Sequence, residues 1–176
     1  TDVQPMWPWE YSFWVNQMRK SKHDFDAELL RPYLSIDAVL KGVFDIVKDL
    51  YGIDVNLLPT TCLQETEILP EGMYEVWHDT VQMYEVRENG KLLGVFYTDW
   101  FPREGKRSGA WMNPLHSATV SLDGTQIPHI GLVCGNLNPP TPGKPALLTF
   151  SNMVTVFHEF GHLFHHILGT VEVAEL

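Results

Sequence analysis

Two histidines flank a short segment near the end of the sequence, in the order His158-Glu159-Phe160-Gly161-His162. In an α-helix, residues four apart lie one turn above each other on the same face, so both imidazoles can reach one ion. Glu159 lies about 100° around the helix from His158, which places its carboxylate beside that ion and not on it. Two neutral imidazoles suit a zinc ion, and a neighbouring carboxylate can take a proton from water. The pattern predicts His158 and His162 as ligands of one Zn²⁺ and Glu159 as a general base.

The competing interpretation is structural, with two core histidines and a surface glutamate. An accidental match of this pattern is expected in roughly 2% of chains of this composition. His165 is a further candidate ligand, because it follows His158 by seven residues and lies within about 20° of the same face. Seven residues span about 10.5 Å of helix, however, which is far for two ligands of one ion. His165 therefore stays open as a ligand or a packing residue, and His166 is expected to be structural or solvent-facing.

A helix from about residue 151 to 168, ending at Gly169, is expected to position these side chains. Its apolar residues cover most of the helix circumference, which predicts a buried helix and not a surface one. These residues are Met153, Val154, Val156, Phe157, Phe160, Leu163, Phe164, Ile167 and Leu168. An apolar surround strengthens the electrostatic attraction between a metal ion and its ligands.

Two further helices are expected in the first fifty residues. Between residues 36 and 51, apolar side chains recur at the three- and four-residue spacing of a helix. Ser35 can cap the amides at its start, and Gly52 can adopt the left-handed conformation that ends it. The aromatic stretch Trp7 to Met18 is expected to form an earlier helix, with Pro8 in or before its first turn.

Alternating apolar residues from about position 74 indicate a small sheet of about four strands. Residues 84–87 and 92–97 flank Asn89-Gly90, the dipeptide best suited to a tight hairpin turn. A hairpin is therefore expected at this position.

A second hairpin is expected where residues 118–122 and 130–134 flank Asp123-Gly124. Between the hairpins lies a glycine-rich basic loop at residues 103–109. Charged side chains in and before this loop could orient a substrate carboxylate, although a solvated loop is the favoured interpretation. These are Asp99, Arg103, Lys106 and Arg107.

The expected fold is α+β and mainly helical, within one domain. Residues 1–70 form the helical part, residues 74–135 a small and mainly antiparallel sheet, and residues 150–168 the buried active-site helix. The six tryptophans are expected to pack in the core and along cleft walls.

Composition narrows the classes of partner. The net charge of −10 repels phosphate backbones and anionic lipid surfaces, so we expect no nucleic-acid binding. No run of residues is apolar enough to span a membrane. The two cysteines, Cys62 and Cys134, have neither metal-motif spacing nor the density of a disulfide framework, which favours a reducing compartment and a cytoplasmic location.

Several segments, in order, resemble one family of zinc peptidases, that of thimet oligopeptidase, oligopeptidase A and dipeptidyl carboxypeptidase. The likeness is strongest from Leu147 through His165, which includes the histidine–glutamate pattern. The other similar segments are Arg31-Pro32-Tyr33, Leu50-Tyr51-Gly52-Ile53, Glu104-Gly105-Lys106-Arg107-Ser108-Gly109-Ala110-Trp111 and Asn136-Leu137-Asn138-Pro139-Pro140. One sequence difference is Phe150-Ser151-Asn152, where many relatives have a histidine followed by two acidic residues.

The resemblance implies a mostly helical peptidase with a deep channel that admits short peptides. It implies that His158 and His162 bind zinc, that Glu159 is the base, and that the reaction is endopeptidase or dipeptidyl carboxypeptidase hydrolysis of oligopeptides. In that family the third ligand is a glutamate on a later helix, which these 176 residues do not contain. The chain is therefore expected to be a partial catalytic domain with little activity alone. The alternative is a non-catalytic module that binds a metal or a peptide.

Overall fold

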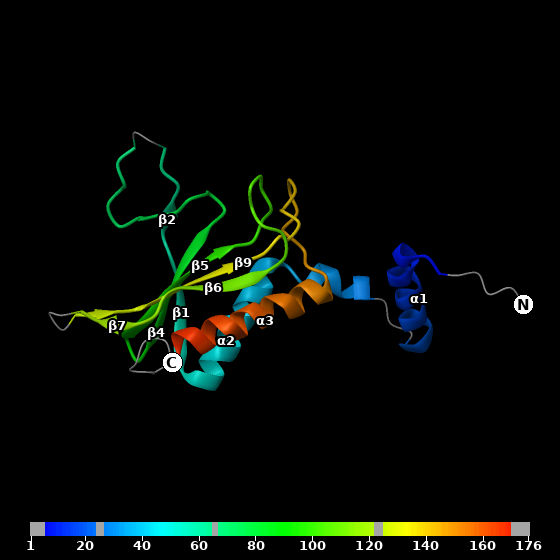
Figure 1. The fold of residues 1–176 in the computed structure, drawn as a ribbon, viewed down its shortest axis with the longest axis horizontal. Helices are drawn as coiled ribbons and strands as arrows, with labels where there is room; N and C mark the ends of the chain where they lie inside the picture. Colours follow the sequence, from blue (N-terminus) through cyan, green and yellow to red (C-terminus); the bar gives the residue numbers. More distant parts are fainter. Residues whose placement is uncertain (1–5, 24–26, 65–66, 122–124, 170–176) are drawn as a thin grey trace, which may run out of the picture.

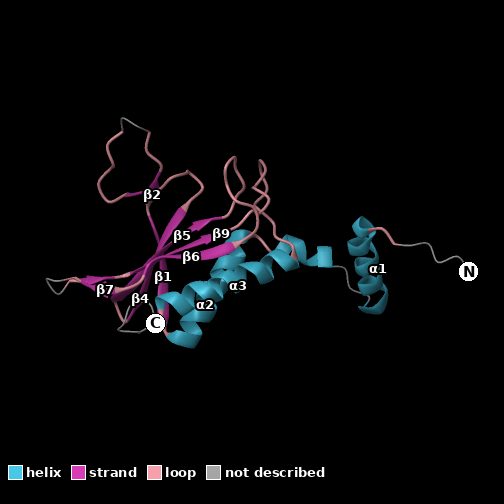
Figure 2. Cartoon of the chain, in the orientation of Figure 1, coloured by secondary structure: helices cyan, strands magenta, loops and turns pink. Residues whose placement is uncertain are grey.

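The computed structural model describes residues 6–23, 27–64, 67–121 and 125–169. Within these residues the chain is α+β, and its two longest helices, α2 and α3, lie side by side against a five-stranded mixed sheet (Figures 1 and 2). The elements in chain order are η1 (Pro8–Glu10), α1 (Tyr11–His23), η2 (Ala27–Tyr33), α2 (Ile36–Tyr51), β1 (Ile53–Leu58), β2 (Thr60–Thr61), β3 (Tyr74–Glu75), β4 (Gln82–Glu88), β5 (Lys91–Asp99), β6 (Trp111–His116), β7 (Thr119–Val120), β8 (Gln126–Ile127), β9 (His129–Cys134) and α3 (Phe150–Ile167).

Helix α2 begins and ends at the residues that its capping signals predict. The Ser35 hydroxyl accepts a hydrogen bond from the Ala38 amide, and Gly52 ends the helix with a φ of 70°. The buried face of α2 consists of Ile36, Val39, Leu40, Val43 and Val47. This face joins the core shared with the sheet and α3, so the expected helix is confirmed.

The sheet has the strand order β1-β4-β5-β9-β6. Strands β5 and β9 are parallel, and the other neighbouring pairs in this sheet are antiparallel. The hairpin of β4 and β5 is confirmed, with Asn89 and Gly90 at φ values of 49° and 83°. Two consecutive positive φ values produce the turn whose twist matches that of the flanking strands.

The second expected hairpin is wrong in its pairing. Strand β7 pairs with β8 and not with residues 130–134, which form most of β9. Pro128 separates β8 from β9, and a proline has no amide hydrogen with which to continue a ladder. β9 instead lies between β5 and β6. The expected turn at Asp123-Gly124 lies outside the described residues.

Two strands of the sheet were not expected. β1 lies within residues 1–70, where helices were expected, and it pairs with β4. Its signal was the alternation of apolar Ile53, Val55 and Leu57 with polar residues. β6 contains Pro114, which argues against a central strand, and it lies at the edge of the sheet where a missing amide is tolerated.

Helix α3 has nearly the expected bounds but is buried on one face only. Its inner face includes Phe160 and Leu163, which are 1% and 0% exposed. On the other side Val154 and Phe157 are 50% and 38% exposed. The apolar residues around the helix predicted that α3 would be buried on most sides. Among the described residues, only one face of α3 is buried.

A glycine in the central sheet lets α3 approach closely. A Cβ added at Gly131 of β9 would lie 2.4 Å from Leu163 Cδ1. Beside this contact, the Phe96 and Phe160 rings pack edge to face with centroids 5.8 Å apart. These contacts fix the distance and rotation of α3 relative to the sheet.

Helix α1 lies apart from α2, α3 and the sheet (Figure 1). Of the two expected places for the tryptophans, core and cleft wall, the core is wrong for Trp7, Trp9, Trp14 and Trp77, each of which is at least 46% exposed. Trp100 is buried at 3% exposure. Within the described ranges, none of the helices combines the length and hydropathy that a membrane span requires.

We predict that Gly131→Ala destabilises the chain by about 1–3 kcal/mol, because the new methyl group displaces a buried leucine in a close-packed core. The matched control is Gly42→Ala in α2, where an added Cβ meets nothing within 4 Å. That change should raise stability by up to about 1 kcal/mol, through helix propensity. Chemical denaturation measures both, and equal stabilities of the two variants would contradict the close contact.

Candidate functional site

His158 and His162 converge at the exposed surface of α3. Their Nε2 atoms are 3.1 Å apart, and their rings are nearly perpendicular, at 86°, with centroids 4.7 Å apart. Both side chains are exposed, whereas the intervening residues Glu159 and Phe160 are buried. The helix thus presents two ring nitrogens to one point outside its surface.

The spacing of these nitrogens fits a shared zinc ion. Two nitrogens that each lie 2.0–2.1 Å from a tetrahedral zinc are roughly 3.4 Å apart. The Nε2 separation of 3.1 Å is close to this value and needs only a small side-chain adjustment. Imidazole nitrogen is also a ligand that zinc prefers. The pair is therefore suited, in chemistry and in spacing, to bind zinc.

No third ligand joins this pair within the part of the chain that the structure describes. Among these residues, no group of three or more His, Cys, Asp or Glu side chains is arranged to hold a metal ion. His165, the further candidate, lines a groove between α2 and α3 together with Phe157 and Phe164. Its distance along the helix axis from His158 explains why the structure does not bring it to the pair.

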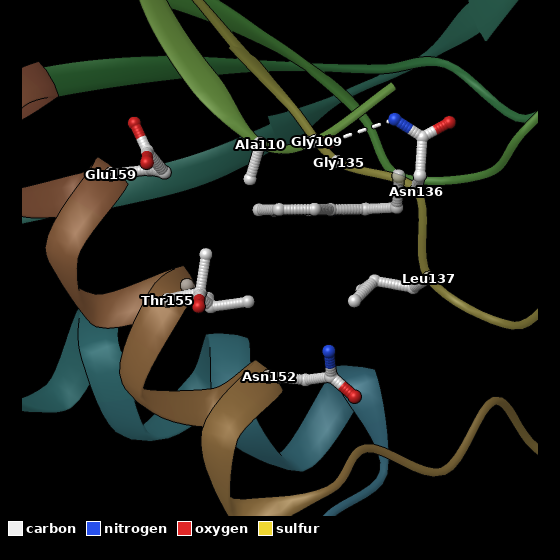
Figure 3. Close-up of a pocket in the computed structure, with 10 residues that line it drawn as sticks. Gly109, Ala110, Gly135, Asn136, Leu137, Asn152, Thr155 and Glu159 are labelled. Carbon is white, nitrogen blue, oxygen red and sulfur yellow. Dashed lines mark hydrogen bonds between the residues drawn. The ribbon is translucent and has the colours of Figure 1, made fainter. Parts of the chain in front are cut away.

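Glu159 lies at the border between the core and a pocket. It is 8% exposed and lines a cavity of about 290 Å³ between α3 and the ends of the central strands (Figure 3). Thr155 lies one turn earlier on the α3 wall, and Gly109 and Ala110 lie on the opposite wall. Glu159 is thus next in sequence to a candidate ligand and lines a space that a small group can enter.

Helix α3 is anchored at both ends. At its start, the Thr149 hydroxyl accepts a hydrogen bond from the Asn152 amide, while the Asn152 carboxamide oxygen accepts one from the Thr149 amide. At its end, His166 Nε2 lies 3.1 Å from the His116 carbonyl oxygen of β6. His166 is therefore structural, which was one of the two expectations for this residue. Asn152, the third residue of the helix, thus completes the capping box with the N-cap Thr149.

His129 of β9 supports the same end of the helix. Its Nδ1 accepts a hydrogen bond from the Ala118 amide, and its Nε2 lies 3.3 Å from the Gly169 carbonyl oxygen. Burial lowers the pKa of His129, and the nearby His166 lowers it further. The neutral form with hydrogen on Nε2 satisfies both contacts.

A buried ion-pair network lies beside the pocket, where β5 ends. Asp99 accepts two hydrogen bonds from Arg103, at 2.8 and 2.7 Å, and one each from Lys106 and Trp77. The side chains of Asp99 and Lys106 are only 3% and 4% exposed. Burial by itself raises the pKa of Asp99, but the hydrogen bonds outweigh it and lower the pKa to about 2.

The favoured interpretation of these charged residues as a solvated loop is wrong for Asp99 and Lys106. Lys106 also donates to the carbonyl oxygens of Asp99 and Phe101, at 2.7 and 2.8 Å, so its three protons have three acceptors. Arg107 lies over the ring of Trp111, 5.6 Å from its centroid. The sequence pattern contained the charges but no signal that they would be buried together.

Comparison with known proteins reveals similarity along nearly the whole chain. The profile of peptidase family M3 matches residues 2–176. Oligopeptidase A of Salmonella typhimurium is 37% identical over 174 residues, which cover 98% of this chain and 24% of that protein. Dipeptidyl carboxypeptidase of Escherichia coli is 37% identical over 96% of this chain and 23% of its own length. An organellar oligopeptidase A of Arabidopsis thaliana, described as chloroplastic/mitochondrial, is 37% identical over 91% of this chain and 19% of its own length. The chain thus spans about a quarter, or less, of the length of these relatives.

We predict that Asp99→Asn costs about 3–5 kcal/mol of stability, because it leaves the buried Lys106 ammonium without a counter-charge. Adding Lys106→Met should recover part of that loss, since the unpaired charge is then removed. Asp45→Asn is the control, because Asp45 pairs with Lys41 on an exposed face of α2. Thermal unfolding measures all four chains, and equal effects of Asp99→Asn and Asp45→Asn would contradict the network.

Proposed function

Because the chain belongs to peptidase family M3, we propose that it carries the metal-binding and general-base helix of a zinc peptidase that hydrolyses short oligopeptides. The observation that carries the proposal is the convergence of the His158 and His162 Nε2 atoms, 3.1 Å apart, with Glu159 between them in sequence and facing a pocket. Both endopeptidase and dipeptidyl carboxypeptidase action are compatible with it. The relatives' names, oligopeptidase A and dipeptidyl carboxypeptidase, support the same substrate class.

In this proposal each residue has a separate task. His158 and His162 hold the metal through neutral Nε2 atoms, which requires that neither ring is protonated there. When bound, zinc supplies Lewis-acid chemistry, polarising a carbonyl and lowering the pKa of water to about 7. A Glu159 carboxylate oxygen takes the proton from water and passes it to the departing amine nitrogen. The pocket beside Glu159 gives the substrate a place next to that carboxylate.

We also propose that these 176 residues turn peptides over only slowly when they are alone. Zinc sites in peptidases generally have three protein ligands, and a site with fewer holds the ion more weakly. Two histidines converge in the described residues, without a third ligand. This observation also favours a second candidate function, a non-catalytic module that binds a metal or a peptide.

We propose the cytoplasm as the location of the activity. Cys62 and Cys134 are both free thiols, which fits a reducing compartment. Burial raises the pKa of Cys134 to about 11, so that thiol resists ionisation and oxidation.

Glu159→Gln should retain zinc and lose the peptidase activity that depends on zinc, because the amide preserves shape but cannot accept a proton. His162→Ala should lose zinc, and His165→Ala is the matched control on the same helix that should keep it. Zinc content measured by mass spectrometry, and chelator-sensitive cleavage of a quenched fluorescent oligopeptide, separate these roles.

Loss of zinc in Glu159→Gln would make Glu159 a ligand and overturn its assignment as the base. Loss of zinc in His165→Ala would make His165 the third ligand. If the wild-type chain binds zinc and its residual cleavage equals that of Glu159→Gln, the binding module becomes the better account.

A further inference from the structure

The wall of the pocket that faces Glu159 is built from two segments that lack regular pairing. One is Gly109-Ala110, at the end of the loop before β6, and the other is residues 135–137, just after β9 (Figure 3). The Ala110 side chain points into the pocket. Gly109-Ala110 therefore form part of the wall opposite α3, the helix that carries Glu159.

Strand pairing does not set the shape of the loop between β5 and β6. Gly105 and Gly109 have φ values of 77° and 94°, a region that other residues rarely adopt. The first half of the loop is held by the Asp99 network described above. The second half, which forms the pocket wall, contributes no side chain to that network.

Asn136 holds the second half of the loop. Its Nδ2 atom donates to the Arg107 carbonyl oxygen at 2.9 Å and to the Gly109 carbonyl oxygen at 2.7 Å, the second of which is drawn in Figure 3. A primary amide is suited to this task, because one nitrogen carries two hydrogens on a short side chain. Both acceptors are backbone atoms, so these two hydrogen bonds constrain the backbone of the loop.

The backbone around Asn136 is itself fixed. The Gly135 amide donates to the Asp99 carbonyl oxygen and the Leu137 amide to the Trp100 carbonyl oxygen, both at 2.8 Å. A Cβ added at Gly135 would lie 3.0 Å from the Trp100 ring, so this segment packs tightly on the start of the loop. Asn136 therefore connects a rigid segment to the second half of the loop, in which Arg107 also lies over the Trp111 ring.

We infer that Asn136 is a positioning residue for peptide binding, which holds the Gly109-Ala110 wall across the pocket from Glu159. The inference rests on the proposed function, because it takes the pocket as the approach to the general base. The Asn136 Nδ2 atom bonds the loop backbone, so loss of these bonds should weaken peptide binding and leave the identity of the base unchanged.

The test uses Asn136→Asp in the full 176-residue chain, with Glu159→Gln as a common background that prevents cleavage. Asp has the shape of Asn but presents oxygen to the two carbonyl oxygens, which it repels. The control is Asn56→Asp, at an asparagine on the distant edge strand β1 whose carboxamide lies 3.3 Å from Glu85. Two quantities are measured with zinc present: the Kd of a fluorescent hexapeptide, and hydrogen exchange of the amides of residues 107–112.

We expect Asn136→Asp to raise the Kd by about five- to tenfold. A fold-change of this size corresponds to the net loss of roughly one to one and a half hydrogen bonds. Exchange at residues 107–112 should become faster, while Asn56→Asp changes neither quantity. Asn136→Ala should give the same direction with a smaller effect, because it removes the bonds without adding repulsion.

An unchanged Kd in Asn136→Asp, with the background chain binding the peptide normally, would overturn the positioning role alone. A background chain that binds no peptide would overturn the proposed substrate class, and the role of Asn136 with it. If Asn136→Asp unfolds, the Kd and exchange of Asn136→Ala decide the question by the same criteria.

Discussion

The packing of α3 on the sheet determines the rest of the site. Phe160 and Leu163 must be buried, and Gly131 lets the helix come close enough to bury them. Once this face is set, helix geometry leaves His158 and His162 on the open side. Glu159 then falls at the border of the core, facing the pocket. The packing of this one hydrophobic face thus leaves the residues suited to hold a metal on the exposed side of α3. The same packing places the residue suited to move a proton beside the pocket.

The loop between β5 and β6 is held in place by a different kind of contact. It passes beside the pocket without forming a strand, so its shape depends on polar anchors. Asp99 and Lys106 supply a buried anchor at one end, and the Asn136 carboxamide supplies a partly exposed one at the other. Breaking a buried ion pair is costly, so the Asp99–Lys106 pair favours one geometry of this loop. Such specificity is useful next to a binding pocket.

Local signals predicted the elements that depend on local physics. Ser35 and Gly52 bound α2 by capping, and Asn89-Gly90 turns the first hairpin through its positive φ values. The spacing of the histidines sufficed to predict that they converge. What the sequence could not provide were contacts between distant segments. The parallel pairing of β5 with β9 joins residues 35 positions apart, such as Gly94 and His129, and the Asn136 carboxamide bonds residues 29 and 27 positions away. Lys106 bonds residues only five and seven positions away, but no local pattern indicates that its side chain is buried. The partial exposure of α3 was missed for the same reason, since an apolar pattern does not reveal which segments cover it.

The central claim is that His158 and His162 bind one metal ion together. Zinc titration followed by side-chain imidazole nitrogen NMR tests this directly, because each ring nitrogen reports its own metal coordination. We predict that the Nε2 resonances of His158 and His162 change with the same midpoint, at one equivalent of zinc, while those of His129, His165 and His166 stay unchanged. Zinc that shifts only one of the pair, or that shifts a different set of histidines first, would contradict the account.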